Sequence, residues 1–359
     1  MYSSQHRQRI YTPGPVQMAP DILEIGGMQT PYFRNAAFSE VVLDCETKLL
    51  ELANAPSGSR VAFLTASGTA AMEAAVMNLL TPARSVGIVN GGSFGQRFVE
   101  ICAVHGVPVQ ELKVDRDPLS DGVALSELRD VDALLVNAHE TSVGHLYDLA
   151  ATGDWCRRHG ALHIVDAISL FVSDPLDMQA QHIDVLIISS HKGLALPPGL
   201  AMVLLSPRAL ERVHPSGSYY LDFGSHLHEG ERGQTPFTPA ISIILQLQHR
   251  LTQLHSQGLN TEWQRAASVA ARFRMGIAEL PLVPYSAHMP NAMTALQLTN
   301  EIPAPWVVGE LESRHGCVVA PNGGKLSDIV FRVSHMGAQD LQDADFIVNA
   351  LMDVLGESK

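Results

Sequence analysis

Short apolar runs alternate with amphipathic, helix-like segments over the first two thirds of this 359-residue chain. Runs of this length are typical of strands that are buried on both faces of a sheet. Helical patterns at residues 70–80, 96–105 and 154–159 separate several of them. The runs themselves are residues 61–64, 86–89, 133–136, 162–165, 185–188 and 201–205. This alternation predicts an α/β fold with a mostly parallel central sheet that helices cover.

The pattern changes after Pro239, and the change predicts a second, smaller domain. Long helical stretches come first, then short alternating segments, and finally one amphipathic helix. They lie at residues 241–258, 261–280, 294–298, 317–320, 329–333 and 341–355. Strands and helices in this order indicate an α+β unit. We therefore expect an N-terminal arm at residues 1–20, a large domain at 21–250 and a small C-terminal domain at 251–359.

Charge and cysteine content exclude several classes of protein. The net charge is −13 and the chain has no basic cluster, so we expect no nucleic-acid partner. No apolar run approaches ~18 residues and the polar N-terminus lacks an apolar export signal, so we expect no membrane partner. The four cysteines lack metal-ligand spacing, which predicts reduced thiols, no bound metal and a cytoplasmic location.

Lys192 and Asp166 carry the clearest chemical meaning in the chain. Lys192 is one of five lysines, and it follows a run at 183–189 that is typical of a buried strand. Asp166 ends the apolar run 161–165, where a carboxylate is costly to bury without a partner. Pyridoxal 5'-phosphate (PLP) requires a lysine that forms a Schiff base and an aspartate that keeps the pyridine nitrogen protonated. We therefore expect PLP as the cofactor, with a helix-capping role for Asp166 as the alternative.

Three other strand ends carry residues that suit this cofactor, because open α/β sheets bind ligands at the carboxyl ends of their strands. Ser67-Gly68-Thr69 opens a helix whose free N–H groups suit a phosphate, with an ordinary helix cap as the alternative. Phe94, within a glycine-rich turn, suits either stacking on a planar ring or capping of the core. Residues 137–142 supply hydroxyl groups, and His139 among them is either a core histidine or a catalytic group.

Several motifs along the chain can be compared with known families. They are Thr12-Pro13-Gly14-Pro15-Val16, Ser67-Gly68-Thr69, the turn at 90–95, His139-Glu140-Thr141-Ser142-Val143-Gly144, Val165-Asp166-Ala167, Ser189-Ser190-His191-Lys192 and Phe331-Arg332-Val333-Ser334-His335-Met336-Gly337. Together they resemble the class V aminotransferases over nearly the whole chain. Within that class they are most similar to the branch of alanine–glyoxylate, serine–pyruvate and 2-aminoethylphosphonate–pyruvate aminotransferases. The resemblance implies a fold-type I PLP-dependent transferase that works as a homodimer with shared active sites.

The resemblance also implies a role for each motif residue. Lys192 would carry the cofactor as a Schiff base and act in catalysis, and Asp166 would pair with the pyridine nitrogen. Phe94 would stack on the ring, and Thr141 would bond to its 3-oxygen. The other implied cofactor contacts are Ser67, Gly68, Thr69, Ile168, His191 and, from the neighbouring subunit, Thr235, and the implied substrate contacts are Gly14 and Arg332.

Three positions depart from the family pattern. His191 stands where the family more often has Gln or Asn, Val143 replaces a usual Thr, and Arg232 replaces an aromatic residue of many relatives. We expect these changes to alter the pocket without abolishing cofactor binding.

The expected reaction is a ping-pong transamination in which an amine donor passes its amino group to a 2-oxo acid such as pyruvate or glyoxylate. The donor would be a small amino acid or a molecule like 2-aminoethylphosphonate, since Arg332 suits a carboxylate or a phosphonate. The alternative is a PLP-dependent lyase, either ammonia-eliminating or desulfurase-like. A desulfurase would need a reactive thiol, for which Cys317 is the only candidate by position, although its surroundings are typical of a core residue. A non-catalytic cofactor-binding protein is a third hypothesis, which the lysine, aspartate and arginine set disfavours.

Overall fold

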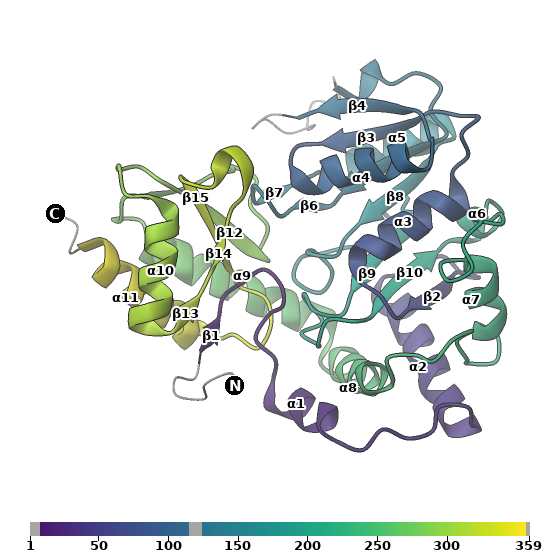
Figure 1. The fold of residues 1–359 in the computed structure, drawn as a ribbon, viewed down its shortest axis with the longest axis horizontal. Helices are drawn as coiled ribbons and strands as arrows, with labels where there is room; N and C mark the ends of the chain where they lie inside the picture. The colour runs from purple at the N-terminus through teal and green to yellow at the C-terminus, as the bar shows by residue number, and fades with distance from the viewer. Residues whose placement is uncertain (1–7, 115–123, 357–359) are drawn as a thin grey trace.

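The structure is a computed structural model that describes residues 8–114 and 124–356. Within these residues, a seven-stranded sheet forms the larger part of the molecule and a four-stranded sheet lies beside it (Figure 1). The order of the larger sheet is β2-β10-β9-β8-β5-β3-β4. Its strands are β2 (Arg60–Leu64), β3 (Val86–Asn90), β4 (Val109–Lys113), β5 (Ala133–Asn137), β8 (Leu162–Asp166), β9 (Val185–Ser189) and β10 (Ala201–Leu205). The prediction of an α/β fold with a mostly parallel sheet is confirmed.

The sequence predicts six of the seven strands of this sheet, and it predicts neither β4 nor the antiparallel direction of β10. The six expected runs coincide with β2, β3, β5, β8, β9 and β10 to within one residue at each end. The sequence does not predict β4, because Val109–Lys113 is largely polar and lies half-buried at the edge of the sheet. β10 runs antiparallel to both β2 and β9, whereas the other neighbouring strands are parallel.

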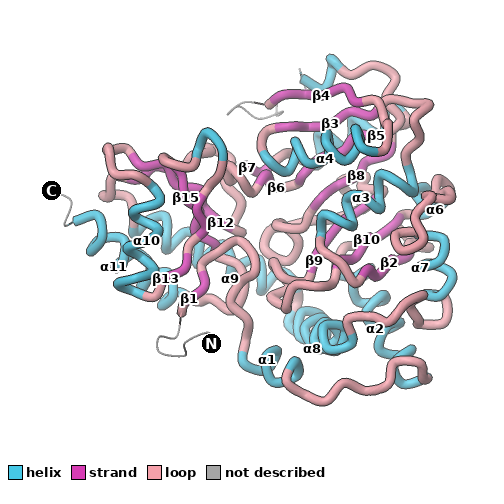
Figure 2. Tube along the Cα trace, viewed as in Figure 1, coloured by secondary structure: helices cyan, strands magenta, loops and turns pink. Residues whose placement is uncertain are grey.

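Helices cover both faces of the large sheet, as Figure 2 shows. Successive side chains of a strand point to opposite faces, so Val61 and Phe63 belong to one apolar cluster and Ala62 and Leu64 to the other. The first cluster includes side chains of α2 (Ala36–Leu52), α5 (Leu149–His159) and α8 (Ile241–Gln257). The second includes side chains of α3 (Gly68–Leu79), α4 (Ser93–Val104) and α7 (Phe223–Gly230).

The smaller sheet has its own apolar cluster. Its order is β11-β12-β15-β14, with β11 (Leu282–Pro284), β12 (Met293–Leu298), β14 (Ala320–Pro321) and β15 (Val330–Ser334). Side chains of α9 (Leu259–Gly276), α10 (Ala304–His315) and α11 (Leu341–Gly356) pack against this sheet. The single strand expected at 317–320 is wrong in detail, because the chain divides there into β13 (Cys317–Val318) and β14, which belong to different sheets.

The N-terminal arm joins the small sheet before it enters the large domain. β1 (Arg9–Ile10) pairs in parallel with β13, and α1 (Pro20–Gly26) follows. The first seven residues of the expected arm lie outside the described residues. The expected boundary between residues 250 and 251 falls inside α8, and the division into three parts stays a prediction. The remaining short elements are β6 (His139–Glu140), β7 (His145–Leu146), α6 (Pro207–Leu210) and two 3₁₀ helices, Ala124–Glu127 and Gly324–Leu326.

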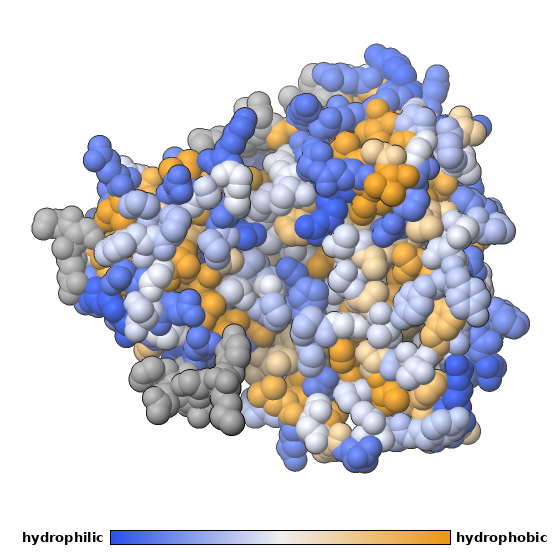
Figure 3. All heavy atoms as spheres, viewed as in Figure 1, coloured by the Kyte–Doolittle hydropathy of each residue, from blue (hydrophilic) through white to orange (hydrophobic). Residues whose placement is uncertain are grey.

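The surface mixes hydrophilic and hydrophobic residues over the face that Figure 3 shows. In the part of the chain that the structure describes, no helix combines the length and the apolar character needed to cross a membrane.

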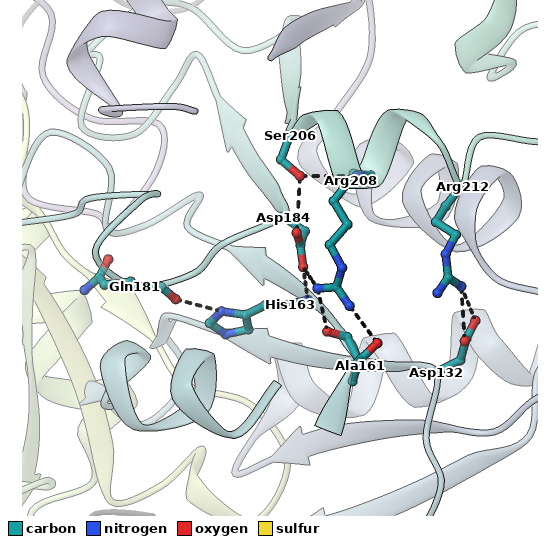
Figure 4. Close-up of polar contacts among 10 residues, drawn as sticks. Asp132, Ala161, His163, Gln181, Asp184, Ser206, Arg208 and Arg212 are labelled. Carbon is teal, nitrogen blue, oxygen red and sulfur yellow. Dashed lines mark hydrogen bonds and ion pairs between the residues drawn. The ribbon is translucent and has the colours of Figure 1, made fainter. Parts of the chain in front are cut away.

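A buried carboxylate ties three segments together at the amino-terminal edge of the large sheet (Figure 4). Asp184, just before β9, accepts hydrogen bonds from the backbone N–H of His163 at 3.0 Å, from Ser206 Oγ at 3.2 Å and from Arg208 at 2.8 Å. Arg208 also donates to the carbonyl oxygen of Ala161. Burial raises the pKa of Asp184, and its hydrogen bonds and the Arg208 charge oppose that rise. The carboxylate therefore fixes the starts of β8 and β9 relative to α6.

Replacing Asp184 with alanine would leave the His163 N–H and the Arg208 guanidinium without their shared partner. We expect the free energy of unfolding to fall by about 2–3 kcal/mol, as measured by urea denaturation. Asp154→Ala is the control, because this exposed side chain loses only its surface pairs with Arg157 and His182 and should cost less than about 0.5 kcal/mol. Equal losses in the two variants would contradict a structural role for Asp184.

Candidate active site

The carboxyl ends of the parallel strands meet around one cavity of about 510 Å³. Gly14, Phe94, Thr141, Lys192 and Arg332 all line it, although they come from segments far apart in the sequence. The rest of the lining comes from the arm, from α10, and from β13, β14 and the residue between them: Thr12, Pro13, Val308, Glu312, Val318, Val319, Ala320 and Pro321. The cavity therefore lies between the large sheet and the small one, where open α/β sheets bind ligands.

Lys192 lies in the turn that follows β9, and only 8% of its surface is exposed. Burial lowers the pKa of its amine to about 8, since a charged ammonium is poorly solvated there. Attraction to Asp166 opposes this shift, while repulsion from Arg332 and Arg97 adds to it. A buried amine with a pKa near 8 is partly neutral at physiological pH, and a neutral amine is a nucleophile.

Gly14 places the N-terminal arm directly against Lys192. A Cβ atom at this position would lie 2.6 Å from Cδ, Cε and Nζ of Lys192. The φ angle of Gly14 is +148°, a region that side-chain-bearing residues rarely adopt. Glycine is therefore required here both for its conformation and for the room that it leaves to the lysine.

Asp166 ends β8, next to β9, and is held by two donors. Asn137 Nδ2 donates to Oδ2 at 2.6 Å, and the backbone N–H of Ile168 donates to Oδ1 at 2.9 Å. The second bond is the local capping contact that the sequence leaves open, and it coexists with the strand-end position. Burial raises the pKa of Asp166 to about 6, while these bonds and the charge of Lys192 oppose the rise. The Ile168 side chain also packs on Gly68, where a Cβ would lie 2.4 Å from its Cδ1.

Thr141 and His139 meet a third segment at Ser169. Thr141 Oγ1 lies 2.6 Å from Ser169 Oγ, and the carbonyl oxygen of Ser169 lies 3.2 Å from His139 Nδ1. Burial lowers the pKa of His139 to about 3, so its imidazole is neutral at physiological pH. His139 is thus a buried, neutral histidine, and its Nε2 has no hydrogen-bond partner among the described residues. Thr141 offers a hydroxyl at the wall of the cavity.

The N-termini of α3 and α4 both lie at this edge. They differ in whether a side chain of the protein accepts hydrogen bonds from their free N–H groups. No side chain caps the N-terminus of α3, where Ser67, Gly68 and Thr69 lie. At α4, by contrast, the carboxylate of Glu140 accepts hydrogen bonds from the backbone N–H groups of Phe94 and Gly95. An external anion would therefore find its N–H donors at α3 rather than at α4.

Arg97 and Glu140 are site residues that sequence reasoning missed. Arg97 donates to Thr69 Oγ1 at 3.1 Å, and its guanidinium lies 4.6 Å from the centre of the Phe94 ring. It follows Phe94 by three residues, which places both on one face of α4. That spacing is a signal that could have identified Arg97. Glu140 stands beside Thr141 in a motif, but its burial could not be inferred from the sequence.

Arg332, on β15, brings the small sheet into the site. It donates to the carbonyl oxygens of Pro321 at 2.7 Å and of Thr141 at 3.4 Å, and its Nε has no protein partner. Burial lowers the pKa of Arg332, while the charge of Glu140 opposes this. The carbonyl contacts orient the guanidinium beside the cavity and leave its charge free for an anionic ligand.

Seven of the ten predicted cofactor contacts do not line the cavity in this chain: Ser67, Gly68, Thr69, Asp166, Ile168, His191 and Thr235. Thr235 donates through its hydroxyl to the carbonyl oxygen of Phe237 at 2.7 Å, and its own carbonyl accepts from Arg34. His191 Nδ1 lies 3.0 Å from Ser189 Oγ, and burial lowers the pKa of His191 to about 4. His191 is therefore uncharged and can offer a hydrogen bond but no positive charge.

The other unusual positions take structural contacts. The backbone N–H of Val143 donates to the carbonyl oxygen of Glu140 at 3.2 Å within the β6–β7 turn. Arg232 forms an ion pair with Glu229 on the surface. Cys317 is buried in β13, and burial raises the pKa of its thiol to about 12, so it lacks the properties of a nucleophilic cysteine.

Comparisons with known proteins agree with this geometry. A family model described as Aminotransferase class-V matches residues 29–319. The chain is 30% identical to a protein of Synechococcus sp. (strain PCC 6716) named "Soluble hydrogenase, small subunit", over 98% of this chain and 94% of that protein. It is 26% identical to the alanine–glyoxylate aminotransferase of Oryctolagus cuniculus, over 96% of this chain and 91% of that protein. The crystal structure of an aspartate aminotransferase of subgroup IV from Thermus thermophilus matches with a TM-score of 0.90 at 32% identity, covering 97% of this chain and 99% of that one.

The chain therefore belongs to the class-V aminotransferase family. It is an aminotransferase with the fold-type I architecture of PLP-dependent transferases, and both predictions from the sequence are confirmed. The hydrogenase name describes the Synechococcus protein and is not carried over to this chain. Among residues 8–114 and 124–356, no group of three or more His, Cys, Asp or Glu side chains is placed to hold a metal ion.

The amine of Lys192 should react as a neutral nucleophile at lower pH than an ordinary lysine. We expect its rate of acetylation, followed by mass spectrometry, to reach half of its maximum near pH 8. Asp166→Asn should move that midpoint to lower pH, because the Asp166 charge raises the pKa of Lys192. Acetylation of the exposed Lys113 serves as the internal reference for reagent decay. A midpoint near pH 10 in the unmodified protein would contradict the effect of burial.

Proposed function

We propose that this aminotransferase binds PLP at Lys192 and moves an amino group from a small donor to pyruvate or glyoxylate by a ping-pong mechanism. The observation that carries the proposal is the pairing of a buried lysine and a buried aspartate at the ends of the neighbouring strands β8 and β9. When bound, PLP would supply an electron-withdrawing ring that stabilises negative charge on the reacting carbon of the donor.

The residues around the cavity fit such a cofactor by their chemistry. Asp166, held by Asn137, offers a carboxylate to the pyridine nitrogen, and Phe94 offers a face to the ring. Thr141 offers a hydroxyl to the 3-oxygen. The uncapped N-terminus of α3 supplies N–H donors for the phosphate, together with side chains that lie beside it: Ser67, Thr69, Arg97 and His191.

Lys192 would act as the proton carrier of the site when its amine is free. Its pKa of about 8 lets the amine accept a proton from the donor carbon and return it nearby, as a general base and then a general acid. Gly14 leaves the room that this movement needs, because any side chain there would meet the lysine at 2.6 Å. The arm also covers the amine, because Gly14 lies directly against it.

Arg332 would bind the carboxylate or phosphonate of the substrate. Its guanidinium is oriented by two carbonyl oxygens, and a planar guanidinium can donate two parallel hydrogen bonds to such a group. A cavity of about 510 Å³ that would also have to hold the cofactor supports a small donor and a small 2-oxo acid.

We also propose a homodimer with shared active sites and a cytoplasmic location. Thr235, which lies outside the cavity of its own chain, would reach the phosphate in the neighbouring subunit. The exposed aromatic rings of Tyr32 and Tyr219 support a subunit contact in the region around Thr235. Tyr32 lies beside Phe33, and the ring centres of Tyr219 and Phe237 are 5.4 Å apart. The four cysteines are free, buried thiols, which suits a reducing compartment.

The proposed reaction is tested by adding L-alanine, L-serine and 2-aminoethylphosphonate separately to the PLP-loaded protein while its visible absorption is followed. We expect one donor to abolish the band of lysine-bound PLP and pyruvate or glyoxylate to restore it. Lys192→Ala should keep its fold by circular dichroism and lose at least about a thousandfold in turnover. Release of ammonia without any oxo acid would instead identify the lyase, and failure to bind PLP would contradict the proposal.

The shared active site is tested by mixing two inactive variants, Lys192→Ala and Thr235→Glu. In a hybrid dimer one site carries both changes and the other carries neither, so we expect the mixture to regain activity. Thr235→Glu should be inactive alone, because its carboxylate would repel the phosphate. Each variant mixed with itself is the control. No recovery, in mixtures shown by mass spectrometry to contain hybrids, would contradict a site that two subunits share.

A further inference from the structure

The carboxylate of Glu140 forms a hydrogen-bonded joint between the start of α4 and the turn that follows β6. It is fully buried on β6, and its carboxylate accepts from the backbone N–H groups of Phe94, Gly95 and Ser142 at 2.9–3.3 Å. It also accepts from Ser142 Oγ, which in turn accepts from the N–H of Ser93 at 3.1 Å. Every neighbour of the carboxylate in this set is a donor, so the group is fully satisfied as an acceptor.

This joint connects two walls of the cavity. On one side it fixes the first turn of α4, whose Phe94 lines the cavity and has the Arg97 guanidinium 4.6 Å from its ring centre. On the other side it fixes the turn that contains Thr141, whose carbonyl oxygen accepts a hydrogen bond from Arg332. A shift of Glu140 would therefore move the ring of Phe94 and the hydroxyl of Thr141 relative to each other.

The Glu140 carboxylate fits beside the backbone of residue 92 only because that residue is glycine. A Cβ atom on Gly92 would lie 2.6 Å from Cδ of Glu140 and 2.3 Å from Ser142 Oγ. A residue larger than glycine at position 92 would push the carboxylate away from the N-terminus of α4. The close approach matters because hydrogen bonds to a charged acceptor are stronger than those between neutral groups.

We propose that Glu140 is a positioning residue that sets the Phe94 ring against the bound cofactor through the N-terminus of α4. The proposal rests on the proposed function, because the ring has this task only if PLP occupies the cavity. Glu140 does not touch the cofactor, and its effect passes through the backbone of Phe94. It also explains why this helix N-terminus is closed to external anions while that of α3 is open.

The test compares Glu140→Gln with the unmodified protein. Glutamine has nearly the same shape, but its NH₂ group would face at least one of the backbone N–H donors, so the joint cannot form fully. We expect the dissociation constant for PLP, measured by titration of the apoprotein, to rise about tenfold. The visible circular dichroism of bound PLP, which reports the orientation of the ring, should change as well.

The matched control is Glu46→Gln, which alters a buried carboxylate away from the cavity. Glu46 accepts from Arg60 Nε at 2.7 Å and from the N–H of Val61 at 2.9 Å. Both variants should lower the thermal midpoint, but only Glu140→Gln should change the PLP affinity. Equal PLP affinity and an unchanged circular dichroism spectrum in Glu140→Gln would overturn the proposal.

A second comparison tests whether the effect passes through Phe94. In a Phe94→Leu background, the further loss caused by Glu140→Gln should fall below about twofold, because coupled residues are not additive. A full tenfold loss in that background would overturn the route through Phe94. If Glu140→Gln fails to fold, Ser142→Ala takes its place in the test. It removes one donor to Glu140, and it should likewise weaken PLP binding. An unmodified protein that binds no PLP would contradict the proposed function itself, and this proposal with it.

Discussion

The burial of a lysine and an aspartate at the ends of two neighbouring strands is the constraint on which the site depends. Burial is the largest influence on both groups, and the net result is a pKa of about 6 for Asp166 and of about 8 for Lys192. Their mutual attraction opposes both shifts, and Asn137 adds a hydrogen bond that favours the charged aspartate. At physiological pH the Asp166 carboxyl is therefore mostly charged and the Lys192 amine is partly neutral, which suits a fixed carboxylate beside a proton-carrying amine.

Other parts of the fold place further residues around Lys192 and Asp166. The N-terminal arm pairs with the small sheet through β1 and places Gly14 against Lys192. β15 of the small sheet delivers Arg332, and α4 delivers Phe94. The cavity is thus assembled from three parts of the chain that are distant in sequence. Glu140 and the carbonyl oxygens around Arg332 link these parts, so that the walls of the site are held to one another as well as to the sheet.

Much of this arrangement could be predicted from the sequence, because a buried strand followed by a polar residue is a local signal. The apolar runs before Asp166 and Lys192 locate the edge where the site lies. Strand direction is not encoded in an apolar run, which is why the antiparallel β10 could not be foreseen. The roles of Asn137 and Glu140 depend on burial and on long-range partners, and in the sequence they resemble any polar residue after a strand.

The most direct measurement of the central claim is reduction of the PLP-loaded protein with borohydride, followed by peptide mass spectrometry. Reduction makes the bond between PLP and a lysine permanent, so the modified peptide identifies the residue that holds the cofactor. The account predicts one phosphopyridoxyl group per chain, on Lys192. Modification of another lysine, or none at all in protein shown to contain PLP, would contradict it.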